Sequence, residues 1–163
     1  QLALCAVLTA LALGLSTLEN LFPVTLVIPL PGVKLGLANI VTVFALYQLG
    51  AGAALAILLT RCLLGGLFAG NLSAILFSVL GGLTAMLVMI FLRRLPKLSV
   101  YGVSIGGAAA HNIGQMAAAV ITLGSTMVLG YLPFLLAVSL FAGALTGFIT
   151  ALLLRATRHI RFH

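Results

Sequence analysis

The strongest constraint on this chain is a series of six long apolar runs joined by short connections. The runs lie at about residues 2–18, 35–49, 51–68, 72–92, 100–123 and 131–154. A helix needs about 20 apolar residues to cross the hydrocarbon core of a bilayer, and these continuous runs lack the alternation of a membrane β-strand. Only 6% of the residues are charged, against roughly a quarter in soluble domains. We therefore predict one all-α integral membrane domain over residues 1–163, a bundle of six transmembrane helices.

The positive charges predict the orientation of this bundle. Six of the eight basic residues follow the fourth or the sixth run: Arg93, Arg94, Lys97, Arg155, Arg158 and Arg161. An even number of crossings places both groups on the side of the N-terminus, and loops rich in Lys and Arg stay in the cytoplasm. We expect both termini to be cytoplasmic. The net charge of +7 is then explained by its role in setting the topology and by attraction to anionic lipid. We expect no nucleic-acid partner.

The residue inventory excludes several kinds of chemistry. Glu19 is the only carboxylate side chain, which removes paired-carboxylate hydrolysis and carboxylate-rich Mg²⁺ sites. Cys5 and Cys62 stand alone in different runs and do not have the spacing of a metal site. The chain also lacks the GxxxxGK[ST] phosphate loop of nucleotide hydrolases. We expect a protein that is not an enzyme and has no cofactor and no metal.

Arg61 is the leading candidate for a binding residue because it lies inside an apolar run. An arginine within a bilayer is costly, and the cost is offset by a partner, a ligand or a water-filled cavity. Arg61 is about eight residues from one end of its run, and His111 is about eleven from one end of its own run. At about 1.5 Å per residue both reach the middle of the membrane. Asn112 and Gln115 extend the His111 cluster.

Three further polar residues are expected nearer the outer face: Asn39, Lys34 and Glu19. Together with the Arg61 and His111 clusters they predict a cavity open to the outside. This cationic set with one acid favours an anionic or polar-headed small molecule, such as a vitamin or a phosphorylated isoprenoid-related compound. The alternative is structural, with Glu19 paired to Lys34 or to Arg61.

Small residues recur every four positions in three of the runs, a pattern typical of close helix contact. The fifth run has Gly102, Gly106, Ala110, Gly114 and Ala118, and the sixth has Gly143, Gly147 and Ala151. Packing within the bundle accounts for both of these ridges. In the first run, Ala6, Ala10 and Gly14 form a third ridge, for which two uses remain open: packing within the bundle, or contact with another protein.

The first external connection carries a resemblance to a known family. Leu18–Asn20, the run Pro29–Ile40 with the sequence PLPGVKLGLANI, and the turn Gly50–Gly52 resemble a bacterial family called Gx transporter or heptaprenyl diphosphate synthase component I. That family is similar to the substrate-binding S components of energy-coupling factor transporters. The resemblance implies six helices in a bacterial cytoplasmic membrane, cytoplasmic termini and a substrate site near the outer face. It also implies that the Ala6–Ala10 pattern meets a transmembrane coupling protein served by ATPases.

The synthase part of the family's name conflicts with the composition of the chain. Prenyl elongation resembles other diphosphate chemistry in its need for aspartate-rich Mg²⁺ sites, and this chain has no aspartate. We therefore do not expect it to be a catalytic subunit. Two hypotheses remain: a substrate-binding component of an uptake transporter, or a non-catalytic membrane subunit linked to isoprenoid or menaquinone synthesis or to a redox complex.

Overall fold

The chain folds into helices joined by short turns over the residues described by the computed structural model, which are 2–21, 36–68, 70 and 72–159. The α-helices are α1 (Leu2–Leu21), α2 (Leu37–Gln48), α3 (Ala51–Phe68), α4 (Leu72–Arg93), α5 (Val100–Leu123) and α6 (Leu132–Ala156). A short 3₁₀ helix, η2 (Thr126–Tyr131), precedes α6. The prediction of an all-α protein with six helices is confirmed for this part of the chain, and α3 and α5 begin and end as predicted.

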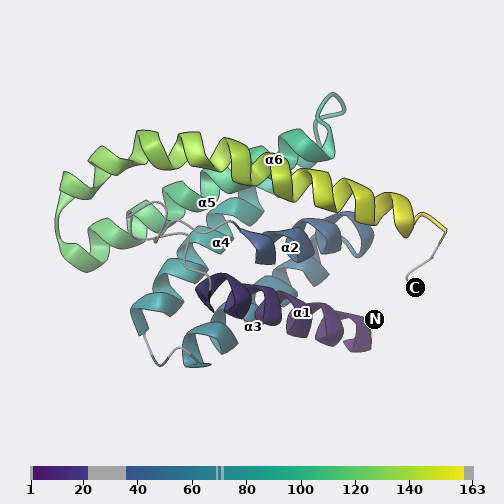
Figure 1. Cartoon of the computed structure of the whole chain (residues 1–163), viewed down its shortest axis with the longest axis horizontal. Helices are drawn as coiled ribbons and strands as arrows, with labels where there is room; N and C mark the ends of the chain where they lie inside the picture. Colours follow the sequence, from purple (N-terminus) through teal and green to yellow (C-terminus); the bar gives the residue numbers. More distant parts are fainter. Residues whose placement is uncertain (1, 22–35, 69, 71, 160–163) are drawn as a thin grey trace.

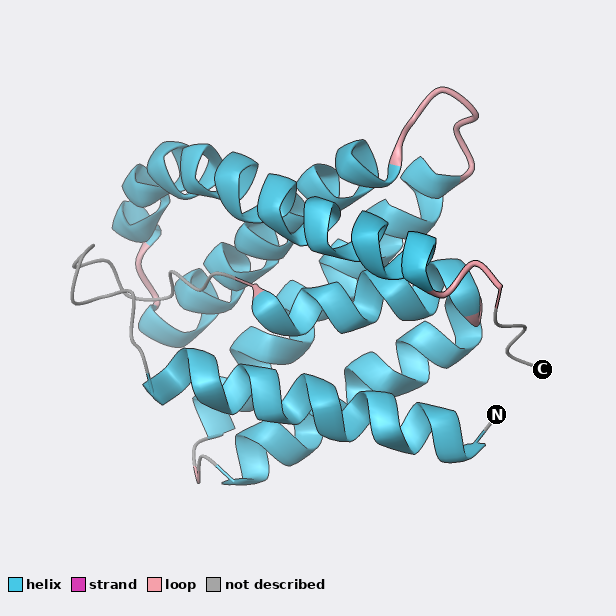
Figure 2. Ribbon diagram, turned by 45° about the vertical axis from the view of Figure 1, so that its right-hand side comes forward, coloured by secondary structure: helices cyan, strands magenta, loops and turns pink. Residues whose placement is uncertain are grey.

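The six helices pack into one bundle (Figures 1 and 2), and the contacts between them form a closed ring. Following contacts around the ring gives the order α1, α3, α4, α5, α6, α2 and back to α1, with α2 also packed against α3. The largest fully buried side chains come from several members of the ring and include Leu46, Ile57, Met86 and Val103. Because the ring closes, each helix has a face toward a shared interior.

Glycines allow the closest crossings in this ring. A Cβ atom added at Gly114 would lie 2.5 Å from the Leu80 backbone oxygen on α4, and one at Gly143 would lie 2.6 Å from the Ile105 Cα atom on α5. Gly106 likewise faces α4 and Gly147 faces α5. These contacts confirm that the small-residue ridges of α5 and α6 serve packing within the bundle.

Four helices are long and apolar enough to cross a membrane: α1, α3, α4 and α6. The 12 residues of α2 cover only about 18 Å, less than the ~30 Å hydrocarbon thickness. α5 has 24 residues, but serine, histidine, asparagine and glutamine lower its hydropathy. The chain is a multi-pass membrane protein. The prediction of six helices is confirmed for the described residues, but only four of these helices have the length and hydropathy of a full membrane crossing.

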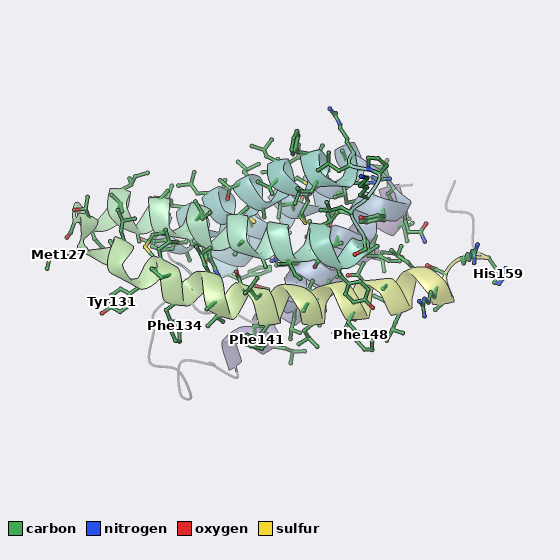
Figure 3. The ribbon with its side chains drawn as sticks, turned by 90° about the horizontal axis from the view of Figure 1, so that it is seen from above. Met127, Tyr131, Phe134, Phe141, Phe148 and His159 are labelled. Carbon is green, nitrogen blue, oxygen red and sulfur yellow. The ribbon has the colours of Figure 1, made fainter. Side chains whose placement is uncertain are left out.

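Large apolar side chains on α6 point away from the other helices (Figure 3). Phe134, Phe141 and Phe148 follow one another at intervals of seven residues and are 45%, 80% and 51% exposed. A soluble protein rarely leaves such a continuous apolar surface in water. Lipid contact explains this face of α6.

The described basic residues that follow α4 and α6 collect at one end of the bundle, where α2, α4 and α6 end. The Arg93 guanidinium donates to the Leu46 backbone oxygen and lies 5.0 Å from the centre of the Tyr47 ring. Gln48 Nε2 donates to Thr157 Oγ1 over 3.0 Å, which joins the end of α2 to the end of α6. The start of α1 and the end of α6 lie at this same end (Figure 1). We call it the basic end; Arg161 lies outside the described residues.

Cysteine labelling tests on which side of the membrane the basic end lies. In a background without Cys5 and Cys62, we expect Ser99→Cys to resist an impermeant thiol reagent in intact cells, because positive loops stay in the cytoplasm. Leu72→Cys, at the opposite end of α4, should react. Reaction of both positions from outside would show that α4 does not cross, and the reverse pattern would invert the orientation.

Candidate substrate-binding site

A pocket occupies the interior of the ring in the half away from the basic end, and all six helices contribute to its wall. It contains about 700 Å³ of empty space, a volume that includes its open mouth. Six of the seven predicted binding residues line it: Glu19, Asn39, Arg61, His111, Asn112 and Gln115. Lys34, the seventh, lies outside the described residues. Residues far apart in the sequence thus meet around one cavity.

Arg61 is the buried charge of this pocket, with 9% of its surface exposed. Its Nε atom is buried and has no hydrogen-bond partner among the described residues. The adjacent residues on α3 that turn inward, Leu58 and Cys62, are 2% and 3% exposed, so the guanidinium shares the helix face that enters the bundle. A buried donor without a partner costs about 1–3 kcal/mol, and more when it is charged. Water or an anion in the pocket would satisfy it.

Glu19 has a structural role that the sequence did not predict. Its Oε1 atom accepts hydrogen bonds from the backbone N–H groups of Gly36 and Leu37, the latter over 3.1 Å. Gly36 is the N-cap of α2 and has no side chain to cap the helix. A carboxylate at a helix N-terminus satisfies open N–H groups and interacts favourably with the helix dipole.

The capping role corrects one structural alternative for Glu19. The structure shows no ion pair between Glu19 and Arg61, both of which it describes, and the carboxylate oxygen binds backbone instead. A pair between Glu19 and Lys34 involves a residue outside the described part of the chain. Glu19 still lines the pocket, where it joins the end of α1 to the start of α2.

The α5 residues of the pocket are held by both neighbouring helices. Asn112 Nδ2 donates to the Leu135 backbone oxygen on α6 over 2.9 Å. On the other side, a Cβ atom added at Gly81 of α4 would lie 2.8 Å from Gln115 Cγ and 2.9 Å from His111 Cε1. Gly81 therefore makes room for both side chains. Sequence reasoning missed this residue, although a glycine pair at 81–82 inside an apolar helix is a signal of close approach.

Hydroxyl groups complete the pocket wall and were also missed from the sequence. Ser139 Oγ donates to the Leu136 backbone oxygen over 2.6 Å, and Thr146 Oγ1 donates to the Ala142 oxygen over 2.7 Å. Both residues line the pocket. A hydroxyl that donates to its own helix satisfies its proton locally, so serine and threonine are common in apolar helices and carry little predictive signal. Here they leave oxygen acceptors for water or a ligand.

The predicted partner ridge of α1 lies on the surface of the described structure. Ala6, Ala10 and Gly14 are exposed, and no atom lies within 4 Å of a Cβ built at Gly14. Leu8 and Ala12, on the opposite face of α1, are 8% and 0% exposed. The ridge does not serve packing among the described helices, in contrast to the ridges of α5 and α6.

Comparison with known proteins identifies the family of the chain. The sequence profile described as heptaprenyl diphosphate synthase component I matches residues 8–153. The chain belongs to this family. The resemblance found in the sequence is thereby confirmed, and the matched region includes all residues of the pocket. No curated protein and no solved structure matches the chain.

Proposed function

We propose that this member of the heptaprenyl diphosphate synthase component I family is the substrate-binding membrane component of a small-molecule uptake transporter, similar to the S components of energy-coupling factor transporters. The observation that carries the proposal is the pocket inside the ring of helices, with the Arg61 guanidinium buried in its wall and with no partner for its Nε atom among the described residues. A protein evolved only for packing would gain by replacing such a charge with an apolar side chain.

The chemistry of the pocket favours a ligand with an anionic or strongly polar group. Arg61 supplies a planar set of donors that fits carboxylate and phosphate, and Asn39, Asn112 and Gln115 add amide groups. The one carboxylate, Glu19, is engaged at the start of α2, so it does not neutralise Arg61 by direct contact. The pocket lies away from the basic end, which is the outer side if that end is cytoplasmic.

Uptake against a gradient would draw its energy from an ion gradient or from a partner, because the given sequence contains no nucleotide phosphate loop. A transmembrane coupling protein with ATPases would provide it. The exposed ridge Ala6, Ala10 and Gly14 supports helix contact with such a partner, since small residues allow two helices to approach closely.

The substitution Ala10→Leu tests this partner contact. We expect transport in cells to fall at least about tenfold, since a leucine side chain separates helices that meet at small residues. Ligand affinity and thermal stability of the purified protein should stay nearly unchanged, because Ala10 is exposed. The matched control is Ala3→Leu, an exposed residue of α1 outside the ridge. A loss of binding equal to the loss of transport would argue against a partner-facing ridge.

Mass spectrometry of the purified protein tests the proposed function directly. The protein is prepared in detergent, denatured, and compared with an Arg61→Leu variant prepared in the same way. We expect a defined small molecule with an acidic or polar group in the first sample and its loss from the second. The same molecule in equal amount in both samples, or none in either, would overturn the proposal.

The description of the family as a synthase component favours a second candidate function. In it, the chain is a non-catalytic membrane subunit of a complex linked to isoprenoid or menaquinone synthesis, and its exposed ridge binds that complex. A catalytic prenyl synthase that co-purifies with the chain, and is released by Ala10→Leu, would support this candidate. An empty pocket in the same preparation would favour it over transport.

A further inference from the structure

A second cavity lies beside the pocket, on the other side of Arg61. It occupies the space between α1, α3 and α4, with about 720 Å³ of empty volume including its opening. Three residues belong to the walls of both cavities: Ser16 of α1, Arg61 of α3 and Ser78 of α4. We call the first cavity the inner pocket and the second the lateral lobe. Their shared wall places the one buried guanidinium of the described bundle at the junction.

The lateral lobe exists because α1 and α4 both pack on α3 and meet each other little. The floor of the resulting groove is the last part of α3, where Gly65 and Gly66 have no side chains to fill the space. The nearest atom to a Cβ built at Gly65 is Leu13 Cδ2, at 3.7 Å. Gly65 therefore borders open space, whereas a Cβ at Gly66 would collide with Ile75.

The lining of the lobe changes from polar to apolar along α3 and α4. Arg61, Gly65 and Phe68 follow at intervals of four and three residues and share one face of the helix. On α4 the lining passes from Ser78 to Ala74, while α1 adds both an apolar group, Leu13, and two hydroxyl groups, Ser16 and Thr17. From Arg61 to Phe68 the groove is about 10 Å long. Phe68 is 79% exposed, so the groove reaches the surface of the bundle at its apolar end.

We propose that the inner pocket and the lateral lobe are two parts of one site for an anionic amphiphile. Its acidic group is held in the inner pocket by Arg61, and its single apolar chain lies in the groove between α1 and α4. This inference rests on the proposed function and names its substrate class. It also gives the buried charge and the adjoining, partly apolar groove one common explanation.

The probes for this inference are inorganic phosphate and monoalkyl phosphates with chains of one to ten carbons. Binding is measured on the full chain in amphipol, for the unchanged protein and three variants. Gly65→Leu fills the floor of the lobe, and Ala74→Leu fills it from α4. Gly52→Leu is the matched control, because it makes the same change on α3 where no atom lies within 4 Å of a Cβ.

We expect affinity to rise with chain length in the unchanged protein and in Gly52→Leu. Both lobe variants should weaken octyl phosphate binding at least about tenfold, the equivalent of about two displaced methylene groups. They should change the affinity for inorganic phosphate less than about twofold, because substitutions that do not touch a bound group have small effects. Comparing variants at equal chain length cancels partitioning of the probes into the amphipol, and thermal unfolding checks that both lobe variants fold.

The outcomes separate this inference from the proposed function. Phosphate binding that requires Arg61 but does not strengthen with chain length, or equal losses for all probes in both lobe variants, would overturn the two-part site and leave the transporter proposal standing. Absence of any Arg61-dependent binding would overturn both. A phospholipid retained by the unchanged protein, lost from Gly65→Leu and not displaced by octyl phosphate, would assign the lobe to membrane lipid and also overturn the inference.

Discussion

Replacing Arg61 with leucine is expected to abolish ligand binding and to leave a folded protein of equal or greater stability. Loss of a buried partner for an anion costs about 2–5 kcal/mol, which weakens binding at least about 30-fold. Stability should not fall, because the change removes a buried charge whose Nε atom has no described partner and inserts an apolar side chain. The measurements are ligand binding by calorimetry and thermal unfolding in detergent.

The conservative substitution Arg61→Lys separates charge from geometry. An ammonium group keeps the positive charge but loses the planar set of donors that binds carboxylate or phosphate at two points. We expect an affinity between those of the unchanged protein and Arg61→Leu. Equal affinity for the lysine and leucine variants would mean that the two-point geometry carries the whole interaction.

Glu19→Gln is the control for the structural alternative in which Arg61 exists to pair with Glu19. The structure assigns Glu19 to the N-terminus of α2. Loss of its charge should therefore lower the free energy of unfolding by about 0.3–1 kcal/mol. The decrease should be the same whether position 61 holds arginine or leucine. Independent sites add in this way, whereas coupled ones do not. Destabilisation by Arg61→Leu that Glu19→Gln reverses would refute the binding role of Arg61.

The substitution Gly114→Ala is expected to cause the largest loss of stability of any single methyl group added to the described helices. Its Cβ would lie 2.5 Å from the Leu80 backbone oxygen and 2.9 Å from the Gly81 Cα atom, and it would also collide with Thr84 Oγ1. Backbone atoms of a packed helix cannot rotate away, so α4 and α5 must separate. We expect the free energy of unfolding to fall by about 3 kcal/mol or more, at or beyond the upper end of the range for overpacked cores.

The matched control for Gly114→Ala is Gly52→Ala, which adds the same methyl group in open space. Alanine is the better helix former by about 1 kcal/mol, so the control should keep or raise the thermal unfolding temperature. Because Gly81 also makes room for His111 and Gln115, Gly114→Ala should weaken ligand binding in whatever fraction remains folded. Equal unfolding temperatures for the two variants would show that the α4–α5 crossing is not as close as described.

The depth of the candidate site could be read from the sequence because depth in a helix is a local quantity. Counting residues at about 1.5 Å each placed Arg61 and His111 at one level, and both line the inner pocket. The neighbours of these residues could not be obtained in this way. Gly81 looks like any other glycine in an apolar run, and only the crossing of α4 over α5 brings it against His111 and Gln115.

The sequence by itself determined the class of this protein, its membrane location and the approximate positions of its helices, since long apolar runs with little charge have few stable states other than helices in a bilayer. It did not determine how the helices meet. The capping of α2 by Glu19 joins residues 17 positions apart, and the lateral lobe depends on α1 and α4 standing apart on α3. Such contacts between distant segments depend on which ridges fit together, and only the tertiary structure decides that.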